Sequence, residues 1–331
     1  MRFCTAILLF ITLCVSQGHS AIVRTLTNTK GVKLEAEITG IWQGKVTFTL
    51  VSDKKSYTVQ INSLVQADQD FLNQRSHLLM LPPPDSGFAE GAVIIAGAEG
   101  SVKVVPDSSG GSESHPAVVG ESLGPNASIV TGKASSAILL FTNGTIATLT
   151  GTSRILLKAF LQSKFESNSG LVNDMKTEPS SSILRLDLSF GDLIVDVKKL
   201  TPKKSSFSIV SPIGVAGIRG TQFHLYARQG VDYLDVTAGS VDYGGGTLPL
   251  KAVGKGKRLV AKKAAGRNDP VLNPLKPIPK PKIREFNGYL RTARENDFVA
   301  KATFDDLRKA AFREPCELVW EFETRNVVTL S

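Results

Sequence analysis

The stretch FSIVSPIGVAGIRGTQF, residues 207–223, decides the fold. Pro212 and Gly214 suit a tight turn, because proline presets its own φ and glycine can take a positive φ without strain. The apolar residues before and after the turn alternate in the manner of β-strands. This stretch therefore predicts a strand, a tight turn and a second strand.

The second half of the stretch places an arginine between two glycines. We expect the backbone to come close at Gly217 and Gly220. Arg219 could then donate to carbonyl groups freed at the turn, or it could hold a carboxylate or phosphate of a ligand. Thr221 and Phe223 share one face of the following strand, and we expect Phe223 to enter the core.

Short apolar runs separated by turn residues surround this stretch from residue 91 to about residue 250. They occupy residues 92–96, 101–105, 137–141, 183–188 and 193–197. No helical spacing interrupts them, and Asn143-Gly144-Thr145 suits a hairpin turn. Regularly spaced strands of this kind predict a mainly β protein built as a sandwich, a barrel or a solenoid.

A family resemblance rests on six stretches that follow one another in the expected order. They are residues 120–123, 129–132, 137–145, 186–193, 207–223 and 236–241. Together they resemble the FecR domain between residues 91 and 250. Known FecR proteins sense an outer-membrane transporter and control an extracytoplasmic sigma factor through a cytoplasmic domain joined by a transmembrane helix. We recognise neither that domain nor that helix, so the resemblance implies only the exported, partner-contacting part of the role.

Residues 21–76 predict a small β unit that ends in a short helix over 63–72. Alternating runs occupy residues 32–38, 45–50 and 57–61. The residues at 24–27, 34–37, 44–46, 59–61 and 71–72 resemble the Sla-type homology domain, a small SH3-like barrel. The resemblance implies binding of a peptide or protein, although Leu26 stands where that family more often has tryptophan. Trp42 is interpreted as a core or hairpin residue, with ligand stacking as the alternative.

The first twenty residues are typical of a secretory signal peptide that is cleaved after Ser20. A lipoprotein signal acylated at Cys14 and an uncleaved anchor are alternatives. We expect a periplasmic or secreted, cell-surface protein. Cys316 would be the single thiol of the mature chain, which excludes an internal disulfide. A proline-rich segment at 77–90 is typical of a stiff linker.

The formal net charge is +9, and its excess lies in residues 251–285, with eleven Lys or Arg against two acids. Five prolines within 270–281 favour an extended spacer there. The candidate contacts for a polyanion are Lys255, Lys257, Arg258, Lys262, Lys263 and Arg267. Such a segment suits anionic envelope polymers or lipid headgroups, or it is a solvated spacer without a partner. Export and the lack of interleaved aromatic residues argue against nucleic acid.

Residues 286–331 form a third piece. Phe298, Phe304 and Leu307 have the spacing of an amphipathic helix, and a terminal strand is predicted at 318–322. This tail either docks on the FecR-like unit or serves as an arm that binds a partner.

No catalytic, metal-ligand or cofactor motif is recognisable in the sequence. We predict no catalytic residues, no metal and no cofactor. The predicted function is that of a non-enzymatic protein-binding, sensory or scaffold component of the bacterial envelope. The alternative is a structural surface protein that binds polysaccharide or cell wall through its basic segment, in peripheral contact with an anionic surface and without a transmembrane span in the mature chain.

Overall fold

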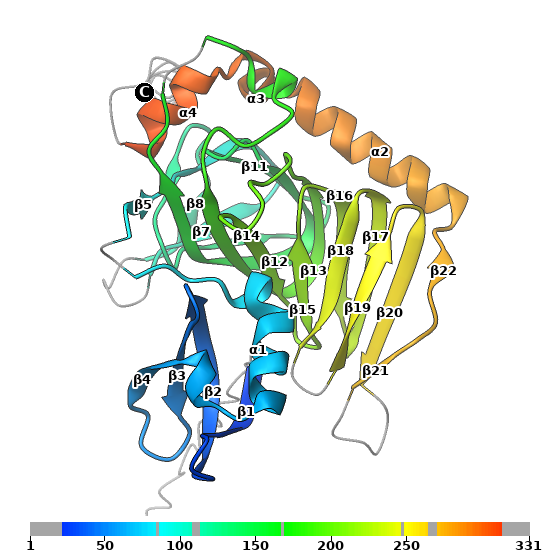
Figure 1. Cartoon of the computed structure of the whole chain (residues 1–331). Coiled ribbons are helices and arrows are strands. Elements are labelled where there is room, and N and C mark those ends of the chain that lie inside the picture. Colours follow the sequence, from blue (N-terminus) through cyan, green and yellow to red (C-terminus); the bar gives the residue numbers. More distant parts are fainter. Residues whose placement is uncertain are drawn as a thin grey trace, which may run out of the picture.

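The computed structural model describes residues 22–83, 86–107, 113–166, 169–245, 248–263 and 270–312. Within these ranges the chain forms a sheet of four strands, a sheet of eighteen strands and a few helices, most of them near the C-terminal end (Figure 1). The predicted mainly β class with a helical C-terminal segment is confirmed. The predicted signal peptide, Arg267, Cys316 and the predicted strand at 318–322 lie outside the described residues.

The N-terminal unit is an antiparallel meander covered by one helix. Its elements are β1 (Ile22–Thr27), β2 (Lys33–Trp42), β3 (Lys45–Leu50), β4 (Ser56–Gln60), the 3₁₀ helix η1 (Ile61–Ser63) and α1 (Gln66–Leu79). Alternate residues such as Ala36, Ile38, Val46 and Phe48 are buried beneath α1, as the period of two in these strands predicts. The described strands of this unit form an open sheet in the order β1-β2-β3-β4, and the SH3-like resemblance stays a prediction.

Helix α1 is longer than the sequence predicts, because it runs to Leu79 instead of ending at residue 72. Leu72, Leu78 and Leu79 are all buried, and this apolar face extends the helix into the expected linker. Residues 80–83 come directly after α1, and the next described strand, β5, begins at Phe88.

The large sheet contains every described strand from β5 onward. Its first strands are β5 (Phe88–Glu90), β6 (Val93–Glu99), β7 (Val102–Val105), β8 (His115–Pro116), β9 (Ser122–Leu123), β10 (Ser128–Thr131), β11 (Ser136–Phe141), β12 (Ile146–Ser163) and β13 (Ser182–Asp196). The remaining strands are β14 (Ser206–Val210), β15 (Val215–Ile218), β16 (Gln222–Arg228), β17 (Val231–Ala238), β18 (Ser240–Gly245), β19 (Leu248–Gly254), β20 (Lys257–Lys263), β21 (Pro270–Leu272) and β22 (Lys276–Pro277).

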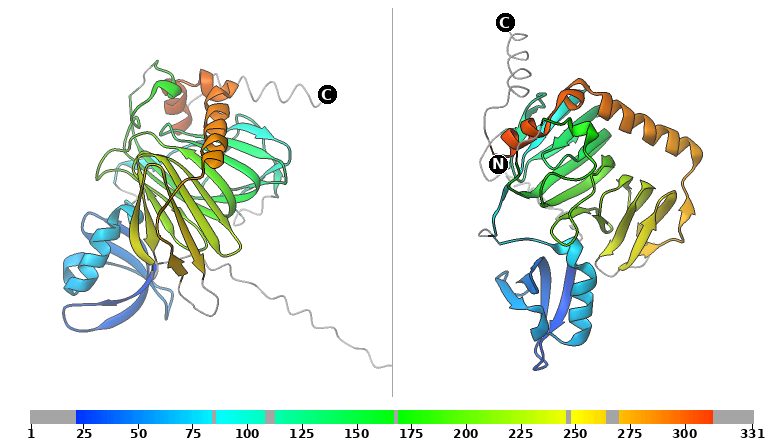
Figure 2. Two further views of the ribbon diagram at one scale, coloured as in Figure 1. Left: turned by 90° about the vertical axis from the view of Figure 1, so that its right-hand side faces the viewer. Right: turned by 45° about the horizontal axis from the view of Figure 1, so that its top comes forward.

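This sheet bends around one hydrophobic core (Figures 1 and 2). Fully buried aromatic side chains from distant strands meet there, including Phe141, Phe207, Phe223 and Tyr243. The predicted hairpin turn after Phe141 is confirmed, with Gly144 at a φ of +82°.

The long strand β13 changes partner halfway along its length. Its first part, Ile183–Asp187, runs parallel to β14, whereas Gly191–Asp196 pairs antiparallel with β16. The change occurs at Gly191, whose φ is +104°. A side chain at this position would meet the backbone of Ser153, because an ideal Cβ would lie 2.4 Å from its Cα. Glycine is therefore required where the sheet bends.

The structure differs from the predicted spacer at residues 251–263, which form parts of β19 and β20. Leu259 and Ala261 of β20 are buried in the core, while their neighbours Arg258, Val260 and Lys262 are not, so the segment alternates as a strand despite its many lysines. Of the prolines that follow, Pro270 lies in β21 and Pro277 in β22, short strands that pair with β20, and Pro281 lies in the first turn of α2.

Three helices follow the last strand. They are α2 (Lys280–Glu295), α3 (Asp297–Lys301) and α4 (Phe304–Ala311). Phe298 and Leu307 are buried in a second apolar cluster with Ile94, Leu140 and Met175 of the large sheet and its loops. The expectation that the tail docks is thus confirmed for residues up to 312. Among the described residues, none of the helices has the length and apolarity needed to cross a membrane.

Candidate functional site

We call residues 207–223 the signature stretch. Hydrogen bonds of Ser211 close the tight turn within it. Its backbone N–H donates to the carbonyl of Gly214 over 2.8 Å, and the N–H of Gly214 donates to Ser211 Oγ over 3.0 Å. Gly214 does not have the positive φ that the sequence suggested. Glycine is needed here for another reason, because a Cβ would lie 2.7 Å from the ring of Tyr243.

A buried carboxyl group holds this turn against the sheet. Asp232, only 2% exposed, accepts hydrogen bonds from Ser211 Oγ and from the hydroxyl of Tyr243, the latter over 2.5 Å. Burial raises the pKa of Asp232 to about 6, against the opposing effect of these two hydrogen bonds. Burial and the nearby carboxyl group also raise the pKa of Tyr243. The cluster lines none of the clefts described below, so its role is to fix the turn.

Arg219 does not lock the turn as the sequence suggested. Its side chain is 66% exposed, and its guanidinium lies 3.9 Å from the carboxylate of Asp242. The backbone turns beside it at Gly220, whose φ is +94°. Phe223 is fully buried, which confirms its predicted place in the core.

Gly217 lies where the N-terminal helix rests on the large sheet. An ideal Cβ at this position would lie 2.0 Å from Cδ2 of Leu78, a buried residue of α1. Because Gly217 has no side chain, α1 can pack closely against β15 at this position. This function of the glycine could not be predicted from the stretch alone, since its neighbour comes from the other folded unit.

Polar contacts surround this packing. His77 Nε2 lies 3.1 Å from Asp242 Oδ2, and Ser206 Oγ donates to the carbonyl oxygen of His77. The neighbouring His77 lowers the pKa of Asp242. Farther along the contact, Arg185 Nη1 donates to the carbonyl oxygen of Thr39 over 2.8 Å. The N-terminal unit is therefore attached by backbone and side-chain groups of α1 and by a backbone carbonyl of β2 to strands β13, β14, β15 and β18.

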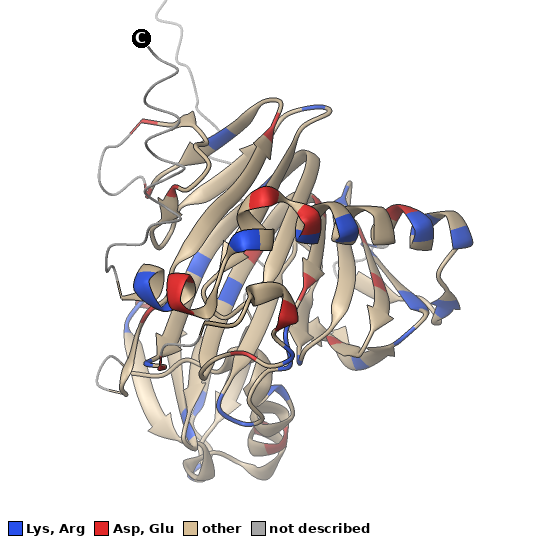
Figure 3. Ribbon diagram, turned by 90° about the horizontal axis from the view of Figure 1, so that it is seen from above, with Lys and Arg blue, Asp and Glu red and all other residues tan. Residues whose placement is uncertain are grey.

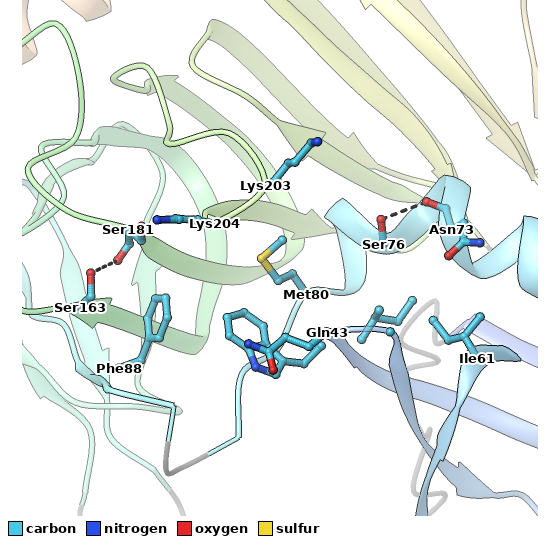
Figure 4. A pocket seen from close by; sticks show the side chains of 13 residues that line it. Gln43, Ile61, Asn73, Ser76, Met80, Phe88, Ser163, Ser181, Lys203 and Lys204 are labelled. Atoms are coloured by element: carbon cyan, nitrogen blue, oxygen red, sulfur yellow. Dashed lines mark hydrogen bonds between the residues drawn. The ribbon is translucent and has the colours of Figure 1, made fainter.

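Two clefts open beside this contact. We call the first the junction cleft. It has a volume of about 630 Å³ and is lined by Ile41, Trp42, Gln43, Gly44, Ile61, Asn73, Ser76 and Met80 of the N-terminal unit and by Phe88, Ser163, Ser181, Lys203 and Lys204 of the large sheet and its loops. In Figure 4, Met80 lies between Phe88 on one side and Asn73 and Ser76 of α1 on the other. Residues of both units therefore form one concave surface.

Trp42 takes part in this surface. It is half-buried, and its ring meets that of Phe88 edge-on, with 5.8 Å between the ring centroids. The sequence interpretation as a hairpin residue describes its place at the end of β2. The ring nevertheless also faces a cleft, a position that suits contact with a ligand.

The second cleft, of about 520 Å³, is more apolar and lies between α1 and the strands beneath it. Leu78, Leu79 and Val215 line it together with Arg185 and Asp187. Burial lowers the pKa of Arg185 to about 10, an effect that the nearby Asp187 opposes. Arg185 thus serves the attachment of the two units.

The basic residues singled out from the sequence lie elsewhere. Lys255, Lys257, Lys262 and Lys263 are exposed on β20 and the turn before it, away from the junction cleft. Arg258 differs, because its guanidinium makes two hydrogen bonds of 2.6 Å to the buried carboxylate of Asp235. Figure 3 shows further basic residues on the nearby end of α2. Four of these basic residues are therefore solvated lysines, whereas Arg258 contributes to the structure by pairing with Asp235.

The described residues contain no group of three or more His, Cys, Asp or Glu side chains arranged to hold a metal ion. His224 pairs with Asp192 over 2.7 Å, as expected for a histidine whose hydrogen bonds are satisfied within the strand pair β13–β16. The sequence reasoning missed Lys203 and Lys204, because two lysines after a proline are an ordinary feature of an exposed turn.

Comparison with known proteins gives a family for part of the chain. Residues 127–242 match the family model described as FecR protein. No curated protein matches the chain. Two crystal structures from Parabacteroides distasonis, both provisionally described as an anti-sigma factor, are similar at 12% and 10% sequence identity, with TM-scores of 0.36 and 0.35. Each similarity covers 48% of this chain, and the chain spans only 63% and 64% of those structures. The segment 127–242, which contains the signature turn, is thus the part of the chain that is similar to the FecR family.

Proposed function

We propose that this protein is an exported, non-enzymatic component of the bacterial cell envelope that binds a protein partner and acts as a sensor or a scaffold. The observation that carries the proposal is the FecR domain at residues 127–242, a family that fits a sensory or signalling role in the envelope. The protein would act in the periplasm or at the cell surface after removal of residues 1–20. The packing of a second folded unit on this domain supports a role in recognition.

Photocrosslinking in intact cells tests this function. A photoreactive residue is placed singly at Gln43, Lys133 and Lys257, three exposed positions on different parts of the surface. We expect at least one position to form a crosslink to one envelope protein in every repeat of the experiment. The crosslinking yield should differ among the three positions. The absence of a specific adduct at every position would contradict partner binding.

A second candidate function is attachment to a cell-wall polymer through the basic segment. The observation that favours it is that Lys255, Lys257, Lys262 and Lys263 are exposed and make no ion pair within the described part of the chain. Unpaired surface cations bind polyanions in a manner that salt weakens.

Sedimentation with isolated cell walls separates the two candidates. The test variant changes these four lysines to glutamine. The control variant makes the same change at four exposed lysines outside the segment, which are Lys30, Lys54, Lys55 and Lys133. Salt-sensitive binding that only the first variant loses supports the polymer. Equal binding of both variants rejects it.

A further inference from the structure

The lining of the junction cleft carries charge of one sign. Its thirteen residues include Lys203 and Lys204 and no Asp or Glu. Both lysines are exposed, and neither makes an ion pair within the described residues. The lysines therefore attract a carboxylate that enters the cleft, and no acidic side chain among the thirteen lining residues opposes this attraction.

The loop that presents these lysines is held in place from beneath. Glu178, which is buried, accepts hydrogen bonds from the backbone N–H of Thr201 over 2.5 Å and from Ser205 Oγ. These contacts flank the two lysines on both sides in the sequence. Because the loop backbone is already ordered, a ligand would not have to organise it on binding.

The other wall of the cleft is apolar and aromatic. Trp42 and Phe88 meet edge-on across it, and Met80 lies beside them (Figure 4). Aromatic rings and a flexible thioether favour a large apolar side chain, because both contribute contact area and adapt to its shape. The cleft thus combines an apolar surface with two cations at its edge.

We propose that the junction cleft binds an acidic segment of a protein partner that carries an aromatic or large aliphatic anchor. The anchor lies against Trp42, Phe88 and Met80, and carboxylates of the segment pair with Lys203 and Lys204. This inference rests on the proposed function, because it names the kind of partner and the place where that partner binds.

Binding at this cleft is coupled to the attachment of the N-terminal unit. Trp42 and Met80 belong to that unit, whereas Phe88 and the lysines belong to the large sheet and its loops. An occupant that touches both sides binds only when α1 rests on β15, and this contact requires the absence of a side chain at Gly217. By linkage, the occupant stabilises the attached arrangement.

Three synthetic peptides test the chemistry of the occupant. The first alternates aspartate with phenylalanine, the second replaces each aspartate with asparagine, and the third replaces each aspartate with lysine. We expect fluorescence anisotropy at low salt to show binding of the first, weaker binding of the second and none of the third. Equal binding of all three peptides overturns the proposal.

Charge reversal tests the place of binding. The double variant Lys203→Glu, Lys204→Glu should bind the acidic peptide at least about ten-fold more weakly. The control, Lys54→Glu with Lys55→Glu, makes the same change in net charge on the β3–β4 turn and should bind normally. Circular dichroism establishes that both variants are folded. Equal loss in the two variants, or no loss in the first, overturns the proposal.

A third variant tests the coupling. Gly217 does not line the cleft, but Gly217→Val should separate α1 from β15, and we expect several-fold weaker binding of the acidic peptide. Unchanged binding by a folded Gly217→Val protein overturns the coupling. If crosslinking captures a partner in cells while the peptide and charge-reversal tests fail, the proposed function stands and the junction cleft is not its site.

Discussion

Replacing Asp232 with asparagine should remove a loss of stability that the protein undergoes as the pH rises. The carboxyl group has an ordinary pKa of 3.8, and in the folded protein burial raises this pKa to about 6. Between these values the folded state holds a proton that the unfolded chain releases. Stability is therefore complete below the lower pKa and declines as the pH rises through the higher one.

The structure sets the size of this effect. A pKa that rises from 3.8 to about 6 corresponds to about 3 kcal/mol in the free energy of unfolding, at about 1.4 kcal/mol per pKa unit. Asparagine keeps an oxygen that can accept the hydrogen bonds of Ser211 and Tyr243, but it carries no charge. The stability difference between variant and wild type should thus shift by about 3 kcal/mol in favour of the variant between pH of about 3 and 7.

Urea unfolding followed by circular dichroism across this pH range measures the effect. Comparing the two proteins isolates Asp232, since other buried acids such as Glu178 titrate in both. Asp53→Asn, at an exposed turn, serves as the control and should follow the wild type at every pH. An Asp232→Asn protein whose stability has the same pH dependence as the wild type would refute the reasoning.

Three further substitutions should change the free energy of unfolding, which urea titration measures. Gly191→Ala should cost at least about 2 kcal/mol, because the added Cβ would meet Ser153 and the φ of Gly191 is positive. The control Gly254→Ala, where an added Cβ has no neighbour within 4 Å, should change the free energy of unfolding by no more than about 0.5 kcal/mol. Similar losses in the two variants would reject the steric argument. Arg258→Ala leaves the carboxylate of its buried partner uncompensated and should cost about 3 kcal/mol, so a neutral result would show that the pair is unimportant. Phe298→Ala should cost about 3 to 5 kcal/mol if α3 is part of the core, and an unchanged value would favour a detached arm.

Local patterns were sufficient to predict much of the segment that matches the FecR family. Phe223 lies in the core because its strand alternates, and the turn after Phe141 forms where Asn-Gly-Thr suits it. The same reasoning failed at β20, because lysine-rich composition was given more weight than the alternation that places Leu259 and Ala261 inside. The lysine content of β20 reflects its exposed side chains, whereas the alternation of its apolar residues indicates which side chains are buried.

The candidate site could not be predicted, for a different physical reason. Its surface exists only when two units pack together, so Trp42 and Lys203 become neighbours through tertiary structure alone. The signature glycines illustrate the same limit. Their spacing predicted a close approach at Gly217, but the residue that approaches is Leu78, far away in the sequence.

The change of partner along β13 has a consequence for the making of the protein. Until β16 has been synthesised, the segment Gly191–Asp196 has backbone groups on one edge with no strand to satisfy them. Bare edges of this kind pair readily with other copies of the same chain. A polypeptide that stops short of Gln222 would therefore present this bare edge and be prone to aggregation.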